Sequence, residues 1–155
     1  HDTYFVVAHF HYVLIGGTMF SFIAGVYYWY PKMTGKMMNE KLGIAHFAAT
    51  FITFNAAFYP MHNVGISGMP RRYATYDSSL TELNQFISIF AILFGLAQLI
   101  FVYNVFYSYR NGKEAGDNPW NGWSLEWATS SPPPENSFIE IPTLLDAEEE
   151  ANKSE

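Results

Sequence analysis

Three long stretches without a charged residue constrain this chain more than any other feature. No Asp, Glu, Lys or Arg occurs from Thr3 to Tyr30, from Leu42 to Pro70 or from Leu83 to Tyr109. A helix needs roughly 20 apolar residues to cross the hydrocarbon core of a bilayer. We therefore predict an all-α membrane protein with spans at about residues 3–29, 42–62 and 84–108. Because Pro60 is followed by two glycines, the second helix is expected to stop or kink near it.

Residues 1–109 thus form a three-helix transmembrane segment, and residues 110–155 form a polar, mostly irregular extramembrane tail. Seven of the fourteen acidic residues lie from Glu135 onward, against the single base Lys153, and they account for the net charge of −6. We expect a solvated, disordered acidic end from about residue 135, with docking to a basic partner as the alternative. The chain has no cysteine. It therefore holds neither a disulfide nor a thiolate-bound copper centre.

Two histidines interrupt the first apolar stretch. His9 and His11 are separated by one residue, so on a helix they point about 200° apart with about 3 Å of rise between them. Neutral imidazole is the commonest metal ligand, and haem iron takes it axially. One helix could therefore ligate two haems, one on each side. The alternative is that each ring hydrogen-bonds a neighbouring helix or lines a polar cavity.

Loop charges indicate the orientation of the spans, because Lys and Arg near helix ends prefer the cytoplasmic or matrix side. The loop between the first two spans carries three lysines, and Arg110 and Lys113 follow the third span. We therefore expect the C-terminus on that side. Arg71 and Arg72 then lie on the opposite face, where the rule disfavours them, so they need an anionic partner. Haem propionates and lipid phosphates are both candidates.

Three sequence blocks resemble subunit I of the haem-copper terminal oxidases. The run His1-Asp2-Thr3-Tyr4-Phe5-Val6-Val7-Ala8-His9-Phe10-His11-Tyr12 is similar to the tenth-helix signature of that subunit. The run Gly65-Ile66-Ser67-Gly68-Met69-Pro70-Arg71-Arg72-Tyr73 is similar to the segment between its last two helices. Leu125-Glu126-Trp127 with Pro132-Pro133-Pro134 is similar to the start of its tail. The resemblance covers residues 1 to about 138 and implies three helices of a twelve-helix bundle, about the final quarter of the subunit.

The resemblance implies a role for each residue of the two conspicuous motifs. His11 would be an axial ligand of the low-spin haem, and His9 the proximal ligand of the high-spin haem at the catalytic centre. Phe10 would fill the space between the haem edges, or serve only as a packing residue. Arg71 and Arg72 would bind the propionates of both haems.

The resemblance also implies metals beyond the haems. His1 and Asp2 would belong to a magnesium site completed by the copper-carrying subunit. The copper ligands of the oxygen-reducing centre lie outside this chain, and we expect only structural hydrogen bonds from His46 and His62. Because the chain starts at His1, we expect either that earlier residues are missing or that it is one piece of a split or cleaved subunit. Alone it would be inactive.

The function implied is that of a proton-pumping terminal oxidase, which reduces dioxygen to water. Asp2, Pro70 and Tyr73 favour the cytochrome c branch of the family, with two haems A as well as copper and magnesium. The expected partners are the remainder of subunit I, subunit II with its dinuclear copper centre, subunit III, cytochrome c and membrane lipid, with no nucleic acid. The membrane would be the bacterial plasma membrane or the mitochondrial inner membrane. The alternatives are a quinol oxidase subunit I and a cofactor-free membrane scaffold or assembly subunit.

Overall fold

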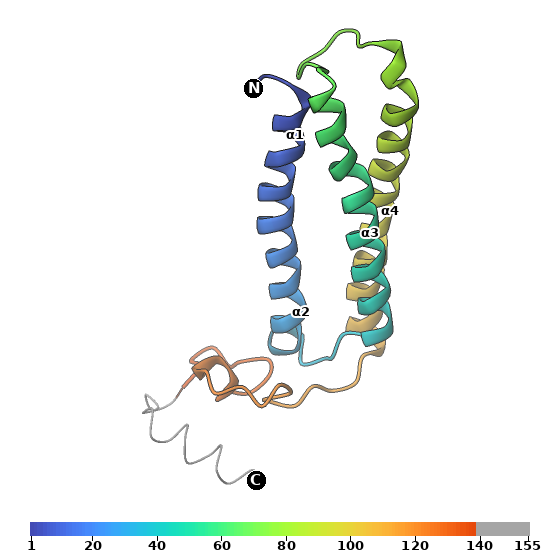
Figure 1. Cartoon of the computed structure of the whole chain (residues 1–155). Coiled ribbons are helices and arrows are strands. Elements are labelled where there is room, and N and C mark those ends of the chain that lie inside the picture. The colour runs from blue at the N-terminus through green and yellow to red at the C-terminus, as the bar shows by residue number, and fades with distance from the viewer. Residues whose placement is uncertain (139–155) are drawn as a thin grey trace. The chain divides into compact units, whose positions relative to one another are not determined.

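The computed structural model describes residues 1–138, and this part of the chain is helical with no strand. Three helices are long and apolar enough to cross a membrane, namely Tyr4–Thr34, Glu40–Ile66 and Ser78–Asn111 (Figure 1). The prediction of an all-α membrane fold is confirmed. The expectation for the acidic end falls largely on residues 139–155, which lie outside the described part. The elements in chain order are α1 (Tyr4–His11), η1 (Tyr12–Met19), α2 (Phe20–Thr34), α3 (Glu40–Ile66), η2 (Ser78–Leu80), α4 (Thr81–Asn111) and η3 (Leu125–Trp127).

Each helix extends beyond the span expected from the sequence, and two prolines lie inside helices. The first helix continues through Pro31 to Thr34, and α3 continues through Pro60 to Ile66, so α3 does not stop at its proline. Proline removes one backbone donor from the helix and its ring crowds the carbonyl four residues earlier, so continuation past it needs compensation. Beyond Pro60, Met61 and Val64 are buried. Continuing the helix therefore buries apolar side chains that an earlier end would expose.

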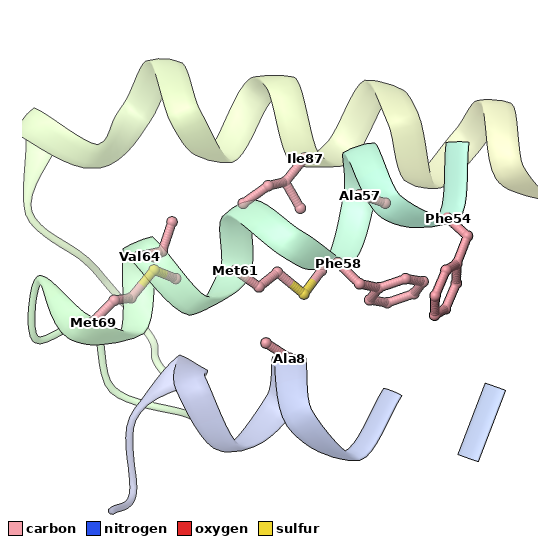
Figure 2. Close-up of a cluster of buried hydrophobic side chains, with 8 residues drawn as sticks. All are labelled: Ala8, Phe54, Ala57, Phe58, Met61, Val64, Met69 and Ile87. Atoms are coloured by element: carbon pink, nitrogen blue, oxygen red, sulfur yellow. The ribbon is translucent and has the colours of Figure 1, made fainter. Parts of the chain in front are cut away.

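Residues 1–24 and 40–103 form one compact unit, whose core lies where α1, α3 and α4 meet. Figure 2 shows Ala8 of α1 opposite the apolar face of α3, with Ile87 of α4 on another side of that helix. The hydrophobic effect contributes little to helix association in a bilayer. Small residues let the helices approach closely, so that van der Waals contacts stabilise the packing. The buried cluster consists of Ala8, Phe54, Ala57, Phe58, Met61, Val64, Met69 and Ile87.

The N-terminal end of α1 crosses α3 at a glycine. A Cβ atom built on Gly65 would collide with the backbone nitrogen and Cα of Phe5. One turn further along α1, Ala8 is completely buried against α3. The two backbones approach this closely because neither position carries a large side chain. This crossing fixes α1 against α3 just before His9 and His11.

Polar side chains join α3 to α4 inside the apolar region. The Nε2 atom of His46 and the Oε1 atom of Gln98 lie 3.2 Å apart in a hydrogen bond. The Gln98 amide donates to the Thr50 hydroxyl at 3.2 Å. His62 instead donates from Nδ1 to the Tyr59 carbonyl of its own helix at 3.1 Å. Both histidines thus make the structural hydrogen bonds expected for them.

Within the described part of the chain, residues 25–39 and 104–138 form a second unit, which ties the end of α2 and the following loop to the tail. Lys36 and Glu114 form an antiparallel bridge, and the Met37 amide donates to the Lys113 carbonyl at 2.8 Å. These backbone hydrogen bonds satisfy polar groups in a loop between two membrane spans. The loop is therefore held in one conformation by the segment that follows α4.

A buried lysine holds the tail within this second unit. The Lys32 ammonium group donates to the carbonyl oxygens of Asp117 at 2.9 Å, Thr129 at 2.6 Å and Ser130 at 3.3 Å. It also lies 5.1 Å from the ring centroid of Trp127, a cation–π distance. Only 6% of Lys32 is exposed. A buried ammonium group needs such compensation, so the charge binds distant tail carbonyls together.

We predict that Gly65→Ala destabilises the packing of α1 on α3. The new methyl group would collide with backbone atoms, which cannot rotate away, and overpacking of this kind costs about 1–3 kcal/mol. The melting temperature of the purified complex should fall. Gly95→Ala is the matched control, because a Cβ atom at Gly95 meets nothing within 4 Å. Equal melting temperatures for the two variants would contradict the close crossing.

We also predict that Lys32→Met loosens the tail. The substitution keeps a long apolar stem but removes three charge-assisted hydrogen bonds. Losing about 2 kcal/mol of local stability would make proteolytic cleavage within residues 117–131 roughly 30-fold faster. Cleavage is followed by gel analysis of the assembled complex. The exposed Lys113→Met should leave the rate unchanged, and an unchanged rate in the Lys32 variant would refute the proposed clamp.

Candidate functional site

The side chain of His11 is held in one tautomer by its own helix. Its Nδ1 atom lies 2.7 Å from the carbonyl oxygen of Val7, one turn earlier. A carbonyl oxygen can only accept, so Nδ1 carries the proton and Nε2 keeps its lone pair. This is the arrangement found in metal-binding histidines, whose second nitrogen is fixed by a hydrogen bond. His11 is thus preorganised to donate Nε2 to a metal.

Two phenylalanine rings restrict how the His11 ring can turn. The ring of Phe10 stacks on it with centroids 4.4 Å apart, and that of Phe58 from α3 stacks at 4.5 Å. The interplanar angles are 28° and 16°. The ring is therefore guided by flat apolar surfaces as well as by its hydrogen bond. Phe10, expected as a packing residue between two cofactors, contacts His11 directly.

His9 differs from His11 in its surroundings although both lie on α1. His9 is exposed, and no hydrogen bond to its ring is found within residues 1–138. Its neighbour Ala8 is completely buried against α3, whereas His11 contacts Phe58 of the same helix. The two imidazoles thus meet different environments from one short helix. An exposed imidazole with no hydrogen-bond partner among the described residues is available to an external ligand.

A second polar contact lies directly after the histidine motif. The Tyr12 hydroxyl donates to Oδ1 of Asn55 on α3 at 2.8 Å. At Tyr12 the helix also changes from α to π geometry. Sequence reasoning placed Tyr12 only within the motif and did not identify Asn55. The available signal was an amide inside an uncharged span, which in lipid needs a hydrogen-bonding partner.

The residues before α1 pair with the loop after α3. Thr3 and Pro70 form an antiparallel bridge, and the Arg71 amide donates to the carbonyl of Asp2 at 3.1 Å. The amide of Tyr4, the first residue of α1, donates to the Met69 carbonyl at 2.8 Å. The structure therefore brings together two groups of residues that lie far apart in the sequence. The bridge lies about 9 Å along α1 from His9, given 1.5 Å per residue.

Arg71 and Arg72 lie in this loop, and within residues 1–138 neither guanidinium forms an ion pair. Arg72 adopts a left-handed backbone conformation with φ of 57°, which is uncommon for a residue with a side chain. Asp2 has φ of 56°. Backbone strain on both sides of the bridge is typical of sites that hold side chains in a required direction. The loop thus places two cations near the N-terminal end of α1.

His1 and Asp2, the predicted magnesium ligands, lie next to the arginine loop. The Nδ1 atom of His1 is 3.4 Å from Oδ2 of Asp2, and both side chains are exposed, at 97% and 80%. In the part of the chain that is described, no group of three or more His, Cys, Asp or Glu gathers. The pair therefore offers one imidazole and one carboxylate at a solvent-facing position. Both ligand types bind divalent cations.

Comparison with known proteins agrees with these features. The sequence model of the family described as "Cytochrome C and Quinol oxidase polypeptide I" matches residues 1–116. The chain is 49% identical to cytochrome c oxidase subunit 1 of Thermostichus vulcanus over 144 residues. It is 51% identical over 144 residues to the subunit of Synechocystis sp. and 52% identical over 147 residues to that of Corynebacterium diphtheriae.

The matches cover nearly all of this chain and a small part of each relative. They include 93% of the chain and 26% of the relative for Thermostichus vulcanus and Synechocystis sp., and 92% and 26% for Corynebacterium diphtheriae. The chain thus spans about a quarter of the length of these relatives. The family match extends over His9 to His11, over the loop that carries Arg71 and Arg72, and over all three long helices. The chain belongs to the cytochrome c and quinol oxidase polypeptide I family.

Proposed function

We propose that this chain supplies the axial histidines of a proton-pumping haem-copper oxidase, which reduces dioxygen to water with electrons from cytochrome c. The observation that carries the proposal is the preorganised His11 imidazole. Its Nδ1 atom is fixed on the Val7 carbonyl, its ring lies between Phe10 and Phe58, and its Nε2 atom is left for a metal. Haem iron accepts such a nitrogen axially, so the donor set fits the cofactor.

The two histidines would serve two haems A. His11 would hold the low-spin haem, and the exposed His9 would hold the high-spin haem on another face of the helix. When bound, the haem held by His11 would supply electron transfer, and the haem held by His9 would supply oxygen binding. Phe10 would keep its ring stacked against His11 and so limit the rotation of the imidazole. The proximity of the two residues on one turn holds the two cofactors close together.

Arg71 and Arg72 would bind the haem propionates. Both guanidinium groups lack a carboxylate partner on the described chain, and their loop is anchored to Asp2, just before the start of α1. Arginine suits this task because its planar donors match a carboxylate and its charge is permanent. The two cations would offset propionate charge in a medium of low dielectric constant. They would also raise the reduction potentials of the haems.

His1 and Asp2 would contribute to a magnesium site. The Nδ1 atom of His1 lies 3.4 Å from Oδ2 of Asp2, and both side chains are exposed. Magnesium commonly takes one or two carboxylates and completes its coordination with water or other groups. We propose that a second subunit provides the remaining ligands. The copper of the oxygen-reducing centre would be held by residues outside this chain.

The proposal places the chain in a larger membrane complex. Its partners would be the remainder of subunit I, subunit II with the dinuclear copper centre, subunit III, cytochrome c and lipid. The C-terminus would lie on the cytoplasmic or matrix side of a bacterial plasma membrane or mitochondrial inner membrane, because lysines and arginines gather in the loops expected there. The relatives named cytochrome c oxidase subunit 1 support cytochrome c as the donor.

Separate removal of the two histidines tests the axial assignment. We predict that His9→Ala abolishes oxygen reduction but keeps the low-spin optical signal, and that His11→Ala mainly removes that signal. The readouts are the optical spectra and the oxygen consumption of the purified complex. His62→Phe is a matched control, because it retains an aromatic ring next to Phe5. Equal loss of both haem signals in both alanine variants would rule out the assignment to two faces.

Removal of one guanidinium tests the propionate role. We predict that Arg71→Gln lowers the midpoint potentials of the haems, because a nearby positive charge stabilises the reduced form. A charge effect of about 1 kcal/mol corresponds to roughly 40 mV for one electron. Potentiometric titration of the whole complex measures the shift. Arg110→Gln, at the far end of α4, should change neither potential, and equal potentials in all three proteins would contradict the role.

A further inference from the structure

The turn of helix that carries His9 and His11, the histidine turn, ends where the helix changes its hydrogen-bond pattern. The backbone N–H of Tyr12 donates to the carbonyls of both Ala8 and His9. The π-helical segment that follows runs to Met19, and the N–H of Phe20 donates to the carbonyl of Ile15. Such segments are rare, and within α-helices they are frequently associated with functional sites. The His9–His11 turn therefore lies directly beside an irregular part of the helix.

The irregular segment packs on the core through Tyr12 and Ile15, and its two glycines add no side chain to that contact. Gly17 has open space where a Cβ atom would be, and a Cβ atom at Gly16 would meet the ring edge of Phe54 at 3.6 Å. None of its residues is buried. In an ordinary helix, interdigitated side chains determine which face meets the neighbour. The crossing at Gly65 fixes the start of α1, and Ile15 packs on the buried cluster beyond the turn. A polar contact next to His11 adds a directional constraint that this apolar packing does not supply.

Tyr12 provides that contact through its hydroxyl group. The hydroxyl donates to Oδ1 of Asn55 on α3 at 2.8 Å. The Tyr12 ring also packs edge-on against Phe54, with centroids 4.9 Å apart. Water does not compete inside a span, and a hydroxyl without a partner there would be costly. The hydrogen bond therefore joins the end of the histidine turn to α3.

The acceptor of this bond is itself held in place. The Asn55 amide nitrogen donates to the carbonyl of Phe51 at 2.8 Å, one turn earlier on α3. This bond determines which end of the amide faces Tyr12, because nitrogen must point to a carbonyl. Phe58, three residues further on, stacks on His11. One face of α3 thus fixes both His11 and the residue after it.

We propose that the Tyr12–Asn55 hydrogen bond is a positioning device for the axial histidines. It locks the rotation of the His9–His11 turn about the helix axis at its junction with the π-helical segment. The two imidazoles then keep their directions towards their metals. The proposal rests on the proposed haem ligation and assigns to Tyr12 and Asn55 a role beyond helix packing. Groups that orient a metal ligand typically affect function about 10–100-fold.

The test uses the whole oxidase complex with Tyr12→Phe, Asn55→Leu and the double variant. Tyr12→Phe keeps the ring against Phe54 and removes only the hydroxyl. Tyr30→Phe is the matched control, since it also removes a hydroxyl that donates to a carbonyl, that of Val105 at 2.7 Å. The readouts are haem content per complex, the electron paramagnetic resonance spectrum of the oxidised low-spin haem, and the turnover rate.

We expect Tyr12→Phe and Asn55→Leu to retain haem but to shift the low-spin resonance and lower turnover by about tenfold. The double variant should resemble either single variant, because both remove the same bond. The control should match the unmodified complex in all three readouts.

An unchanged resonance in Tyr12→Phe, or the same shift in the Tyr30 control, would overturn the positioning role while haem is bound. Additive shifts in the double variant would overturn the pairing with Asn55. If Asn55→Leu does not assemble, Tyr12→Phe alone decides. A complex without haem before any substitution would instead overturn the proposed function, so the two failures are distinguishable.

Discussion

The close crossing of α1 and α3 is the constraint on which the arrangement of the site depends. It requires a glycine at position 65 and a small residue at position 8, because the Phe5 backbone occupies the space where a Cβ atom of Gly65 would lie. Between membrane helices the hydrophobic effect gives little drive, so such close approach provides much of the attraction. Once α1 lies there, His11 reaches Phe58 and Tyr12 reaches Asn55.

The same crossing connects the two ends of the proposed site. At the start of α1, backbone hydrogen bonds join Tyr4 to Met69 and Asp2 to Arg71. The loop with the arginines is thereby fixed relative to the helix with the histidines. The proposed metal sites would draw on both elements, so this rigidity matters more than the strength of any one contact. Within residues 1–138, the ring of the exposed His9 has no hydrogen bond, and the guanidinium groups of Arg71 and Arg72 form no ion pair.

The membrane class and the two motifs could be predicted from sequence because both depend on local patterns. Uncharged stretches predict spans, and the two histidines, one residue apart, point in different directions on any helix. The ends of the helices are harder to predict from sequence, because continuation of α3 past Pro60 depends on the burial of later side chains. The π-helical segment and the partner of Tyr12 could not be predicted either. Both depend on which face of α3 lies opposite α1, and periodicity within one span does not contain that information.

The most direct test of the account is a pyridine haemochrome spectrum of the detergent-solubilised complex purified through this chain. It reports the type and the amount of haem together, without relying on turnover. The account predicts two haems A per complex, one for each imidazole of the histidine turn. Haem B or O would contradict the assignment of haem A and favour the quinol oxidase branch. A complex without haem would contradict the central claim that His9 and His11 are axial ligands.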